Sequence, residues 1–317
     1  MPRDFDQLDW NDDCRDACRK LVRLAIVEDL GREYDWTTLA LVPASSGAAN
    51  IVSRQSGIVA GLLCVQVVLE EYNADMQLEC FIQDGDAVQP GSVVATVSGD
   101  SRHLLTSERV FLNMLCRLSG IASLVRKFVD AVAETSAKIY DTRKTTPGWR
   151  LLEKYAVRCG GGCNHRQSLA DAILIKDNHL AIGHSLATHS TDDQSDKDTP
   201  AQAVRRAREF LANIDQPYRR EPRRMIEVEV DSLEQLRQVL PESPDIVLLD
   251  NMTPESLQEA VSIRNELNAT VELEASGGVS LETVAAIAAT GVERISAGAL
   301  THQATWLDFG LDWKTRG

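Results

Sequence analysis

Hydrophobic and polar positions in the first part of the chain predict a helix, then strands, then helices again. Residues 14–30 carry apolar side chains at helical spacing. Between about 49 and 100 the apolar runs shorten to strand-like pieces, NIVSRQ, MQLECFIQ and SVVATVSG, separated by Gly, Asp and Pro. Residues 104–134 predict two helical runs that meet near Ser119 and Gly120. We therefore expect an α/β domain here, rich in strands and accompanied by helices.

The rhythm changes from about residue 137, where strand-like runs begin to alternate with helical ones. The helical pieces include 232–240, 254–266 and 281–289, and the strand-like runs are AKIYDT, AILIKDN, MIEVEV, DIVLLDN, TVELEASGG and ERISAGA. Such alternation predicts parallel βα units that close into a barrel or form an open sheet. Nearly every run ends in polar or charged residues, which favours a (β/α) barrel of the TIM type with its active site where those ends gather.

The change of rhythm also predicts the domain division. A chain of 317 residues is long for one core, so two domains are expected. We place the N-terminal α/β domain at 1–134 and the α/β barrel at 135–302, with the tail 303–317 packing back on the N-terminal domain. Residues 187–200 are polar, acidic and of low complexity, which predicts a solvated surface insertion without a catalytic role.

Charge and cysteine content narrow the class of protein. The chain has 33 Lys and Arg against 47 Asp and Glu, a formal net charge of −14, which argues against non-specific nucleic-acid binding and docking on anionic membranes. No apolar run reaches the length of a membrane span, and the charged N-terminus is unlike a signal peptide. Seven cysteines without a disulfide framework or the usual zinc-ligand spacing indicate a reducing cytoplasm.

A short basic cluster stands out in this acidic chain. The stretch DTRKTTPGWR (141–150) places Arg143 and Lys144 beside a Thr-Thr-Pro-Gly turn. Pro147 and Gly148 break any helix across the turn, so a solvated helix face does not explain the two cations. The stretch is better interpreted as a loop that holds an anion.

Basic side chains recur at strand ends and in the loop GGGCNHRQ. Five of them are interpreted as a group: Arg143, Lys144, His165, Arg166 and Lys176. Their gathering on one barrel face predicts a polyanionic substrate, and arginine suits a two-pronged grip on carboxylates. Three neighbours are interpreted as surface charge: Arg150, Lys154 and Arg158. An alternative role for Lys176 is a Schiff base, as in barrel aldolases.

Carboxylates lie on neighbouring strands of the predicted barrel. In IEVEV, Glu227 and Glu229 share one face of the strand, and Asp250 ends the next strand. Buried carboxylates need cations, and Mg²⁺ carried by a phosphate ligand is a natural partner. An internal ion pair with Lys144 or Lys176 is the alternative.

The last two predicted strands end in glycine-containing turns. These turns are Ser276-Gly277-Gly278 and Ser296-Ala297-Gly298. Glycines let backbone N–H groups approach an oxyanion, and the N-terminus of a following helix adds a favourable dipole. Because barrels often hold a phosphate after their last strands, two such turns in succession predict a phosphate site.

Several long segments together resemble the quinolinate phosphoribosyltransferase family. The segments are EDLGREYDWTT (28–38), SERVFLNMLCRLSGIAS (107–123), DTRKTTPGWRLLEKYAVRCGGGCNHR (141–166), LIKDNH (174–179), IEVEV (226–230), LLDNM (248–252), LEASGG (273–278) and ISAGALTH (295–302). They follow the family's order over nearly the whole chain. The chain lacks a glycine expected before the aspartate of EDLGREYD, and 187–200 looks like an insertion.

The resemblance implies a fold, an assembly and a reaction. Family members join an α/β N-terminal domain to an incomplete α/β barrel, and they form dimers in which each N-terminal domain caps the partner's barrel. The implied reaction condenses quinolinate with phosphoribosyl pyrophosphate in the presence of Mg²⁺, giving nicotinate mononucleotide, pyrophosphate and CO₂ for NAD biosynthesis. No organic cofactor is implied.

The resemblance also implies roles for particular residues. Those expected to hold the quinolinate carboxylates are Arg143, His165, Arg166 and Lys176, joined by Arg109 from the other subunit. Lys144 would sit between quinolinate and the sugar diphosphate, while Glu229 and Asp250 would meet the Mg²⁺–ribose side. Substrate contacts, chiefly to the 5-phosphate, are expected at Ser276, Gly277, Gly278, Ser296, Gly298 and His302. The catalytic set is Lys144, Lys176, Glu229 and Asp250, of which Glu229 and Asp250 are also the expected Mg²⁺ ligands, directly or through other groups.

Three other functions stay open on the sequence alone. A related phosphoribosyltransferase would act on another ring without decarboxylation, and a Schiff-base aldolase would use the same barrel. A non-catalytic anion-binding protein is the third alternative, although it would not need the acidic pair Glu229 and Asp250.

Overall fold

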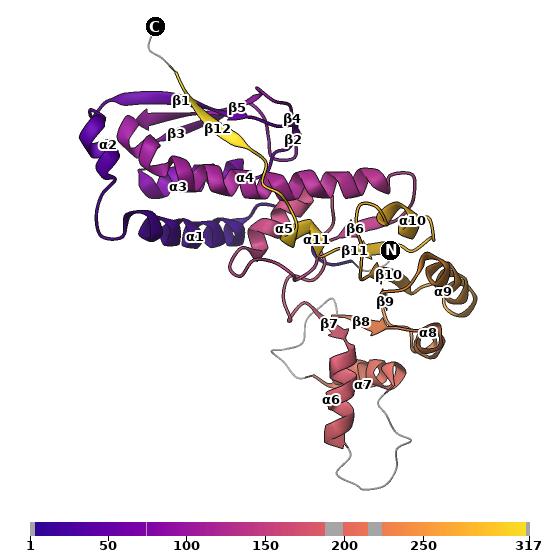
Figure 1. Cartoon of the computed structure of the whole chain (residues 1–317). Helices are drawn as coiled ribbons and strands as arrows, with labels where there is room; N and C mark the ends of the chain where they lie inside the picture. Colours follow the sequence, from indigo (N-terminus) through magenta and orange to yellow (C-terminus); the bar gives the residue numbers. More distant parts are fainter. Residues whose placement is uncertain (1–3, 74, 188–198, 215–223, 315–317) are drawn as a thin grey trace. The chain divides into compact units, whose positions relative to one another are not determined.

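The structure is a computed structural model that describes residues 4–73, 75–187, 199–214 and 224–314. The chain divides into two units, and the first is built on a six-stranded parallel sheet. This parallel unit comprises residues 1–6, 130–143 and 165–297. Its strand order is β6-β11-β10-β9-β8-β7 (Figure 1). The strands are β6 Lys138–Tyr140, β7 Ala172–Ile175, β8 Met225–Val230, β9 Ile246–Asp250, β10 Glu272–Ser276 and β11 Arg294–Ser296. Since β6 and β7 are edge strands that do not pair with each other in the described residues, the barrel is incomplete.

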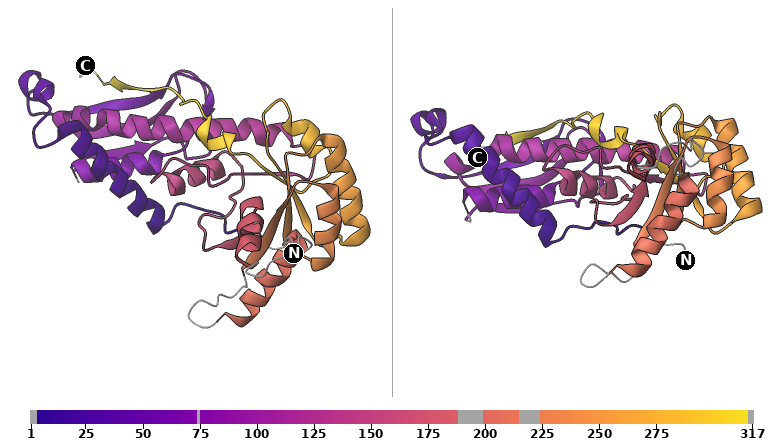
Figure 2. Two further views of the ribbon diagram at one scale, coloured as in Figure 1. Left: turned by 60° about the horizontal axis from the view of Figure 1, so that its bottom comes forward. Right: turned by 90° about the horizontal axis from the view of Figure 1, so that it is seen from below.

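Buried apolar runs explain why these strands lie at the centre of the unit. In β9, Ile246 to Leu249 are all buried, as strands with helices packed on a parallel sheet require. The helices are α6 Asp177–Ala187, α7 Pro200–Asn213, α8 Leu233–Val239, the 3₁₀ turn η1 Leu240–Glu242, α9 Pro254–Leu267 and α10 Val284–Ala288. Figure 2 shows the orange-to-yellow helices α8 to α10 along one side of the strands.

Local sequence signals fix where the helices of this unit begin. Thr199 and Gln202 form a capping box at the start of α7. Ser232 and Thr253 cap α8 and α9 through their hydroxyl oxygens, which accept backbone N–H groups three residues on. The predicted strands and the predicted helices at 232–240, 254–266 and 281–289 are therefore confirmed within a few residues.

The second unit contains a four-stranded antiparallel sheet packed with helices. This antiparallel unit comprises residues 7–129, 144–164 and 298–317, and its main sheet has the order β12-β1-β5-β3. Its strands are β1 Ser46–Ser53, β2 Gly57–Ile58, β3 Gln77–Cys80, β4 Ala87–Val88, β5 Val93–Asp100 and β12 Phe309–Trp313; its helices are α1 Asp12–Leu30, α2 Trp36–Leu41, α3 Leu62–Tyr72, α4 Ser101–Ala131, α5 Arg150–Cys159 and α11 Ala299–His302. Strand β12 pairs with β1, so the tail returns to the N-terminal sheet.

Helix α4 corrects one prediction. Residues 101–131 form a single helix, not two runs meeting at Ser119 and Gly120. The small side chains serve close packing, because a Cβ at Gly120 would collide with the carbonyl oxygen of Thr305. The Ser119 hydroxyl accepts the Ala60 N–H at 2.9 Å and donates to the Ala60 carbonyl at 3.1 Å. A glycine inside a helix is tolerated where another backbone must approach this closely.

The two units alternate along the chain. Residues 4–6 belong to the parallel unit, and 144–164 belong to the antiparallel unit, whereas the predicted domains were continuous stretches. The predicted boundary near 134 stays a prediction, and most of the predicted insertion 187–200 lies outside the described residues. Among the helices described, none is long and apolar enough to cross a bilayer.

Candidate active site

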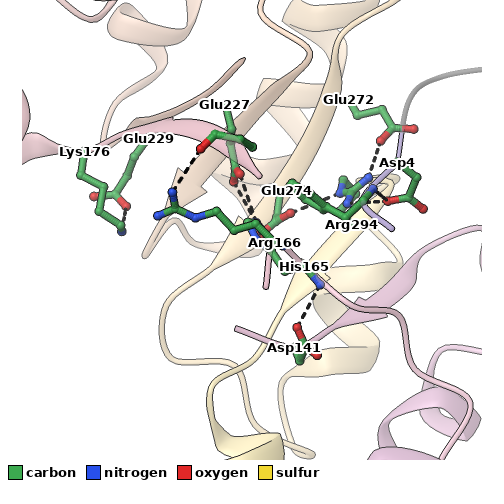
Figure 3. Close-up of polar contacts among 12 residues, drawn as sticks. Asp4, Asp141, His165, Arg166, Lys176, Glu227, Glu229, Glu272, Glu274 and Arg294 are labelled. Carbon is green, nitrogen blue, oxygen red and sulfur yellow. Dashed lines mark hydrogen bonds and ion pairs between the residues drawn. The ribbon is translucent and has the colours of Figure 1, made fainter. Parts of the chain in front are cut away.

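A buried network of charged side chains occupies the interior of the parallel unit (Figure 3). The Nε2 atom of His165 lies 3.1 Å from Glu227 and 3.5 Å from Glu274. Both carboxylates are completely buried. The register aligns Glu227 with Ile246 of β9, which in turn pairs with Glu272 of β10. Glu227 and Glu274 therefore stand in the middle of their strands, not at the strand ends.

Arg294 is the second cation of this network. Its guanidinium contacts Glu274 at 3.2 Å, Glu272 at 2.9 Å and Asp4 at 2.9 Å. The guanidinium carbon lies 3.9 Å from the ring centroid of Tyr140, and the Tyr140 hydroxyl donates to Asp4 at 3.0 Å. Burial disfavours the charge, but the neighbouring carboxylates, Glu274 foremost, raise the pKa of Arg294. The arginine is thus held as a cation among acids.

The contacts of the two ring nitrogens of His165 favour different protonation states. The Arg166 N–H donates to Nδ1 at 2.8 Å, as it would to a neutral ring. Although burial lowers its pKa, Glu227 and Glu274 raise the pKa of His165 to about 10. We assign the imidazolium, because a buried carboxylate without a counter-charge costs more than a strained contact between adjacent residues.

This network fits an ion cluster better than a metal centre. Within the described ranges, one group of ligand-type side chains, His165, Glu227 and Glu274, has atoms within 4.8 Å of one another. An imidazolium has no lone pair to offer a metal. His165 and Arg294 lower the pKa of Glu274 to about 2 in spite of its burial, so two protein cations already balance the acids.

Two arginines of the parallel unit lie near each other, and neither forms an ion pair with a carboxylate among the described residues. Burial lowers the pKa of Arg166, and the nearby charge of Arg143 lowers it further. The Nε atom of Arg143 is buried without a hydrogen-bond partner, and no ion pair of Arg143 occurs among the described residues. A buried polar atom without a hydrogen-bond partner is costly, so these two arginines are candidates for binding an anion.

Lys176 and Glu229 form an ion pair at the carboxyl ends of β7 and β8. The backbone N–H of Lys176 donates to Nδ1 of His179 at 2.9 Å, which anchors the start of α6. Lys176 is thus observed in an ion pair with Glu229, and the structure gives no support for a Schiff-base role. Of the alternatives for the acidic side chains, the ion pair to Lys176 is the one observed.

Asp250 ends strand β9 and is exposed. The next residue, Asn251, has a left-handed backbone with φ of 58°, and its N–H donates to the Ser276 carbonyl at 2.8 Å. Gly277 has φ of 88°, and a Cβ there would lie 2.9 Å from the Asn251 nitrogen. Glycine is therefore required at this turn, because the carboxyl end of β10 lies close to the carboxyl end of β9.

The other late turn is less open than predicted. Ser296 is buried and lies close enough to Glu274 to contribute to lowering its pKa. Its side chain thus faces the buried network, while the exposed Gly277 and Gly278 offer their backbone at the surface. The predicted phosphate roles of both turns stay predictions.

The remaining predicted residues belong to the antiparallel unit. A Cβ at Gly298 would lie 2.8 Å from Cδ of Lys144 and 3.3 Å from Nε2 of His302, so these three residues lie together. The Lys144 carbonyl accepts the Thr301 hydroxyl at 2.7 Å. Arg109 is exposed on α4.

One of the residues interpreted as surface charge is not on the surface. Lys154 on α5 is fully buried, because α5 turns that face toward the interior. Glu153 beside it is also fully buried and pairs with Arg117 at 2.7 Å. The prediction of surface charge is therefore wrong for Lys154. The sequence analysis also did not predict helix α5, which begins directly after Trp149.

An open barrel that presents unmatched arginines and a glycine turn beside its strand ends is suited to phosphorylated, anionic substrates. Fold and site thus define a barrel enzyme of that class. The family models "Quinolinate phosphoribosyl transferase, N-terminal domain" and "C-terminal domain" match residues 35–119 and 121–312. The chain belongs to the quinolinate phosphoribosyl transferase family.

Individual relatives match over nearly their whole lengths. The nicotinate-nucleotide pyrophosphorylase [carboxylating] of Mycobacterium leprae is 45% identical over 304 residues, covering 95% of this chain and 99% of the relative. The probable enzyme of that name from Bacillus subtilis is 37% identical, covering 93% and 92%. The solved structure of nicotinate-nucleotide pyrophosphorylase from Francisella tularensis has a TM-score of 0.84 at 33% identity, covering 98% of this chain and 100% of that one.

Proposed function

We propose that this protein transfers the phosphoribosyl group of phosphoribosyl pyrophosphate to quinolinate and releases CO₂, forming nicotinate mononucleotide and pyrophosphate. Among the structural observations, the pair Arg143 and Arg166 supports this most directly. Quinolinate carries two adjacent carboxylates, and two guanidinium groups without matching acids are suited to them. Relatives named for this reaction at up to 45% identity support the choice of substrates.

The proposed reaction begins with bond formation at the ribose C1. The quinolinate nitrogen attacks the ribose C1 as pyrophosphate departs, through an oxocarbenium-like state that nearby carboxylates stabilise. Glu229 and Asp250 are proposed for that task. Mg²⁺ enters with the diphosphate as part of the substrate and neutralises the leaving group. The carboxylate of the exposed Asp250 accepts no hydrogen bond from the described residues, which suits a contact to the magnesium–ribose portion.

Decarboxylation follows from the charge left on the ring. Once the ring nitrogen is bonded to ribose and cationic, the bond between C2 and the 2-carboxylate breaks and CO₂ departs. The electron pair stays on C2 as an ylide that the adjacent cationic nitrogen stabilises, and C2 then takes up a proton from water. Arginines that hold the ring carboxylates orient the bond that breaks. The ammonium of Lys176 has three N–H donors, so it can keep its contact with Glu229 while it contacts the substrate.

The assembly and location belong to the same proposal. We infer a homodimer in which Arg109 of one protomer reaches the substrate of the other, because Arg109 is exposed on α4 rather than at a strand end. None of the seven cysteines, all of which lie within the described residues, forms a disulfide, which fits a reducing compartment such as the cytoplasm.

A carbon-release assay tests the proposal. The protein is incubated with quinolinate labelled in the 2-carboxylate, phosphoribosyl pyrophosphate and Mg²⁺, and equal amounts of labelled CO₂ and nicotinate mononucleotide are expected. Nicotinate in place of quinolinate should give no nucleotide. Arg143→Met and Arg166→Met should abolish turnover, whereas Arg237→Met, on the exposed surface of the parallel unit, should not. Product without CO₂ release would favour the non-decarboxylating alternative and overturn the proposal.

A further inference from the structure

The first described residues of the chain pack against the buried network instead of extending into solvent. The Phe5 ring lies 4.3 Å from the His165 ring, centroid to centroid, with an interplanar angle of 31°. Phe5 is 6% exposed and packs with Ala172, Met225 and Ile246. These are the first residues of β7, β8 and β9, respectively. Phe5 therefore covers the amino ends of three parallel strands, opposite the edge where substrates are proposed to bind.

Asp4 anchors the same segment through charge. Its carboxylate accepts hydrogen bonds from Arg294 at 2.9 Å and from the Tyr140 hydroxyl at 3.0 Å. The Phe5 N–H donates to Asp4 at 2.8 Å, which fixes the direction in which the ring points. Arg294 also lies 5.2 Å from the Phe5 centroid. Asp4 and Phe5 thus contact both cations of the network.

The residue before His165 is held by the continuation of this segment. In the antiparallel unit, the amide side chain of Asn164 is completely buried. The side-chain Oδ1 of Asn164 accepts the backbone N–H of Leu8 at 2.8 Å. The backbone N–H of Asn164 donates to Oε1 of Gln7 at 2.8 Å, and the backbone carbonyl of Asn164 accepts a hydrogen bond from Nε2 of Gln7 at 3.1 Å. Residues 4–8 therefore hold the chain on both sides of the peptide bond that joins Asn164 to His165.

We propose that residues 4–8 form a positioning clamp for the His165–Arg166 pair and so determine affinity for the substrate's carboxylates. The observation that carries this is the stacking of Phe5 on His165 together with the Asp4–Arg294 ion pair. Arg166 follows His165 directly, and its guanidinium is buried near Arg143. A shift of His165 displaces the Arg166 backbone by a similar amount, and a bidentate grip on a carboxylate tolerates little displacement. The proposal rests on the proposed function for its substrate, but the clamp itself does not.

Two variants loosen the clamp at different points. Phe5→Leu removes the aromatic face while keeping a large apolar side chain, and Asp4→Asn removes the charge that meets Arg294. Asp6→Asn is the matched control, since Asp6 is an exposed acid in the same segment. Initial rates are measured well below each variant's melting temperature, with quinolinate and phosphoribosyl pyrophosphate varied separately.

The expected result is a split between the two substrates. The KM for quinolinate should rise at least about tenfold in Phe5→Leu and Asp4→Asn, a loss of about 1.4 kcal/mol of binding. kcat and the KM for phosphoribosyl pyrophosphate should change less than about threefold, and Phe5→Tyr, which keeps the ring, should recover most of the affinity. Equal losses in kcat and both KM values, or no change in any of them, would overturn the clamp.

A spectroscopic measurement separates this inference from the proposed function. With histidines labelled at Cε1, the His165 resonance is assigned by its loss in His165→Gln. Stacked on Phe5, it should show a ring-current shift that disappears in Phe5→Leu and persists in Asp6→Asn. The charged groups around it, Glu227, Glu274, Arg294, Arg166 and Asp141, are unchanged in that variant. A wild-type protein without turnover but with this shift would refute the proposed function alone, whereas an unaltered resonance in Phe5→Leu would refute the clamp.

Discussion

Replacing Arg294 by methionine should destabilise the parallel unit far more than a surface arginine does. Arg294 is 2% exposed and contacts three carboxylates, of which Glu274 is fully buried while Glu272 and Asp4 keep partial access to water. Methionine fills much of the same volume. The main loss is therefore electrostatic: Glu274 stays in the interior with His165 as its remaining cation.

The magnitude follows from the removal of one partner of a buried ion pair, which costs about 3–5 kcal/mol. His165 and Arg294 both lower the pKa of the buried Glu274, so His165 still stabilises this carboxylate after Arg294 is removed. We therefore expect Arg294→Met to lose about 3 kcal/mol of unfolding free energy at pH 7.5, the lower end of that range.

The pH dependence gives the sharper test. A lowered folded-state pKa means that the wild-type contribution of Glu274 is complete above its unfolded pKa and is lost as the pH falls toward about 2. In Arg294→Met the pKa of Glu274 rises, so protonation at mildly acidic pH relieves the penalty in the variant first. The stability gap between wild type and variant should therefore shrink by roughly 1 kcal/mol or more between pH 7.5 and pH 4.5.

Urea unfolding followed by far-UV circular dichroism measures this gap at both pH values. Arg237→Met is the control in the same unit, because Arg237 and its partner Glu259 are both exposed and 3.9 Å apart; its loss should stay below about 0.5 kcal/mol. A loss under about 1 kcal/mol for Arg294→Met at pH 7.5, or a gap that widens at pH 4.5, would refute the electrostatic account of the network.

Three further predictions follow from the same structure. Gly120→Ala should lower the melting temperature even though alanine favours a helix by about 1 kcal/mol, because its Cβ meets the Thr305 carbonyl; a thermal melt that shows stabilisation would contradict the packing role. Chelation of Mg²⁺ should stop turnover, and Asp250→Asn should lower kcat far more than it weakens quinolinate binding measured by calorimetry; full turnover in excess EDTA would remove the metal from the mechanism. Mixing inactive Arg109→Ala with inactive Lys176→Ala under subunit exchange should restore about a quarter of wild-type activity, and no recovery in verified mixed dimers would mean that Arg109 does not act across the dimer.

Periodicity predicted the parallel unit well because its strands are buried on both sides. The runs MIEVEV and DIVLLDN were predicted as strands, and β8 and β9 match them nearly residue for residue. It failed at α4, where Ser119 and Gly120 read locally as a break. The reason for those small residues is the backbone of Ala60 and Thr305, distant contacts that local pattern does not contain.

The candidate site shows the same division between local and distant information. Arg143, Arg166 and Lys176 could be proposed as site residues because cations next to turns and strand ends are visible in the sequence, and their roles stay predictions. Lys154 was misjudged because its burial depends on which face of α5 turns inward. Asp4 and Phe5 were missed altogether, since a lone Asp-Phe near the N-terminus carries no signal until it is seen against His165 and Arg294.

The buried network explains why the proposed substrate face can afford unmatched arginines. Glu227 and Glu274 lie within the sheet and are already balanced by His165 and Arg294, so they do not neutralise Arg143 directly. A barrel interior filled with aliphatic side chains would leave Arg166 among apolar neighbours, where its charge would be far less favourable. Acids in the interior lower that cost through space, as the effect of Glu227 on the pKa of Arg166 indicates. In the proposed function the arginines then remain charged until a dianion binds, and the proposed clamp, which holds His165 beside those acids, contributes to binding without contacting the substrate.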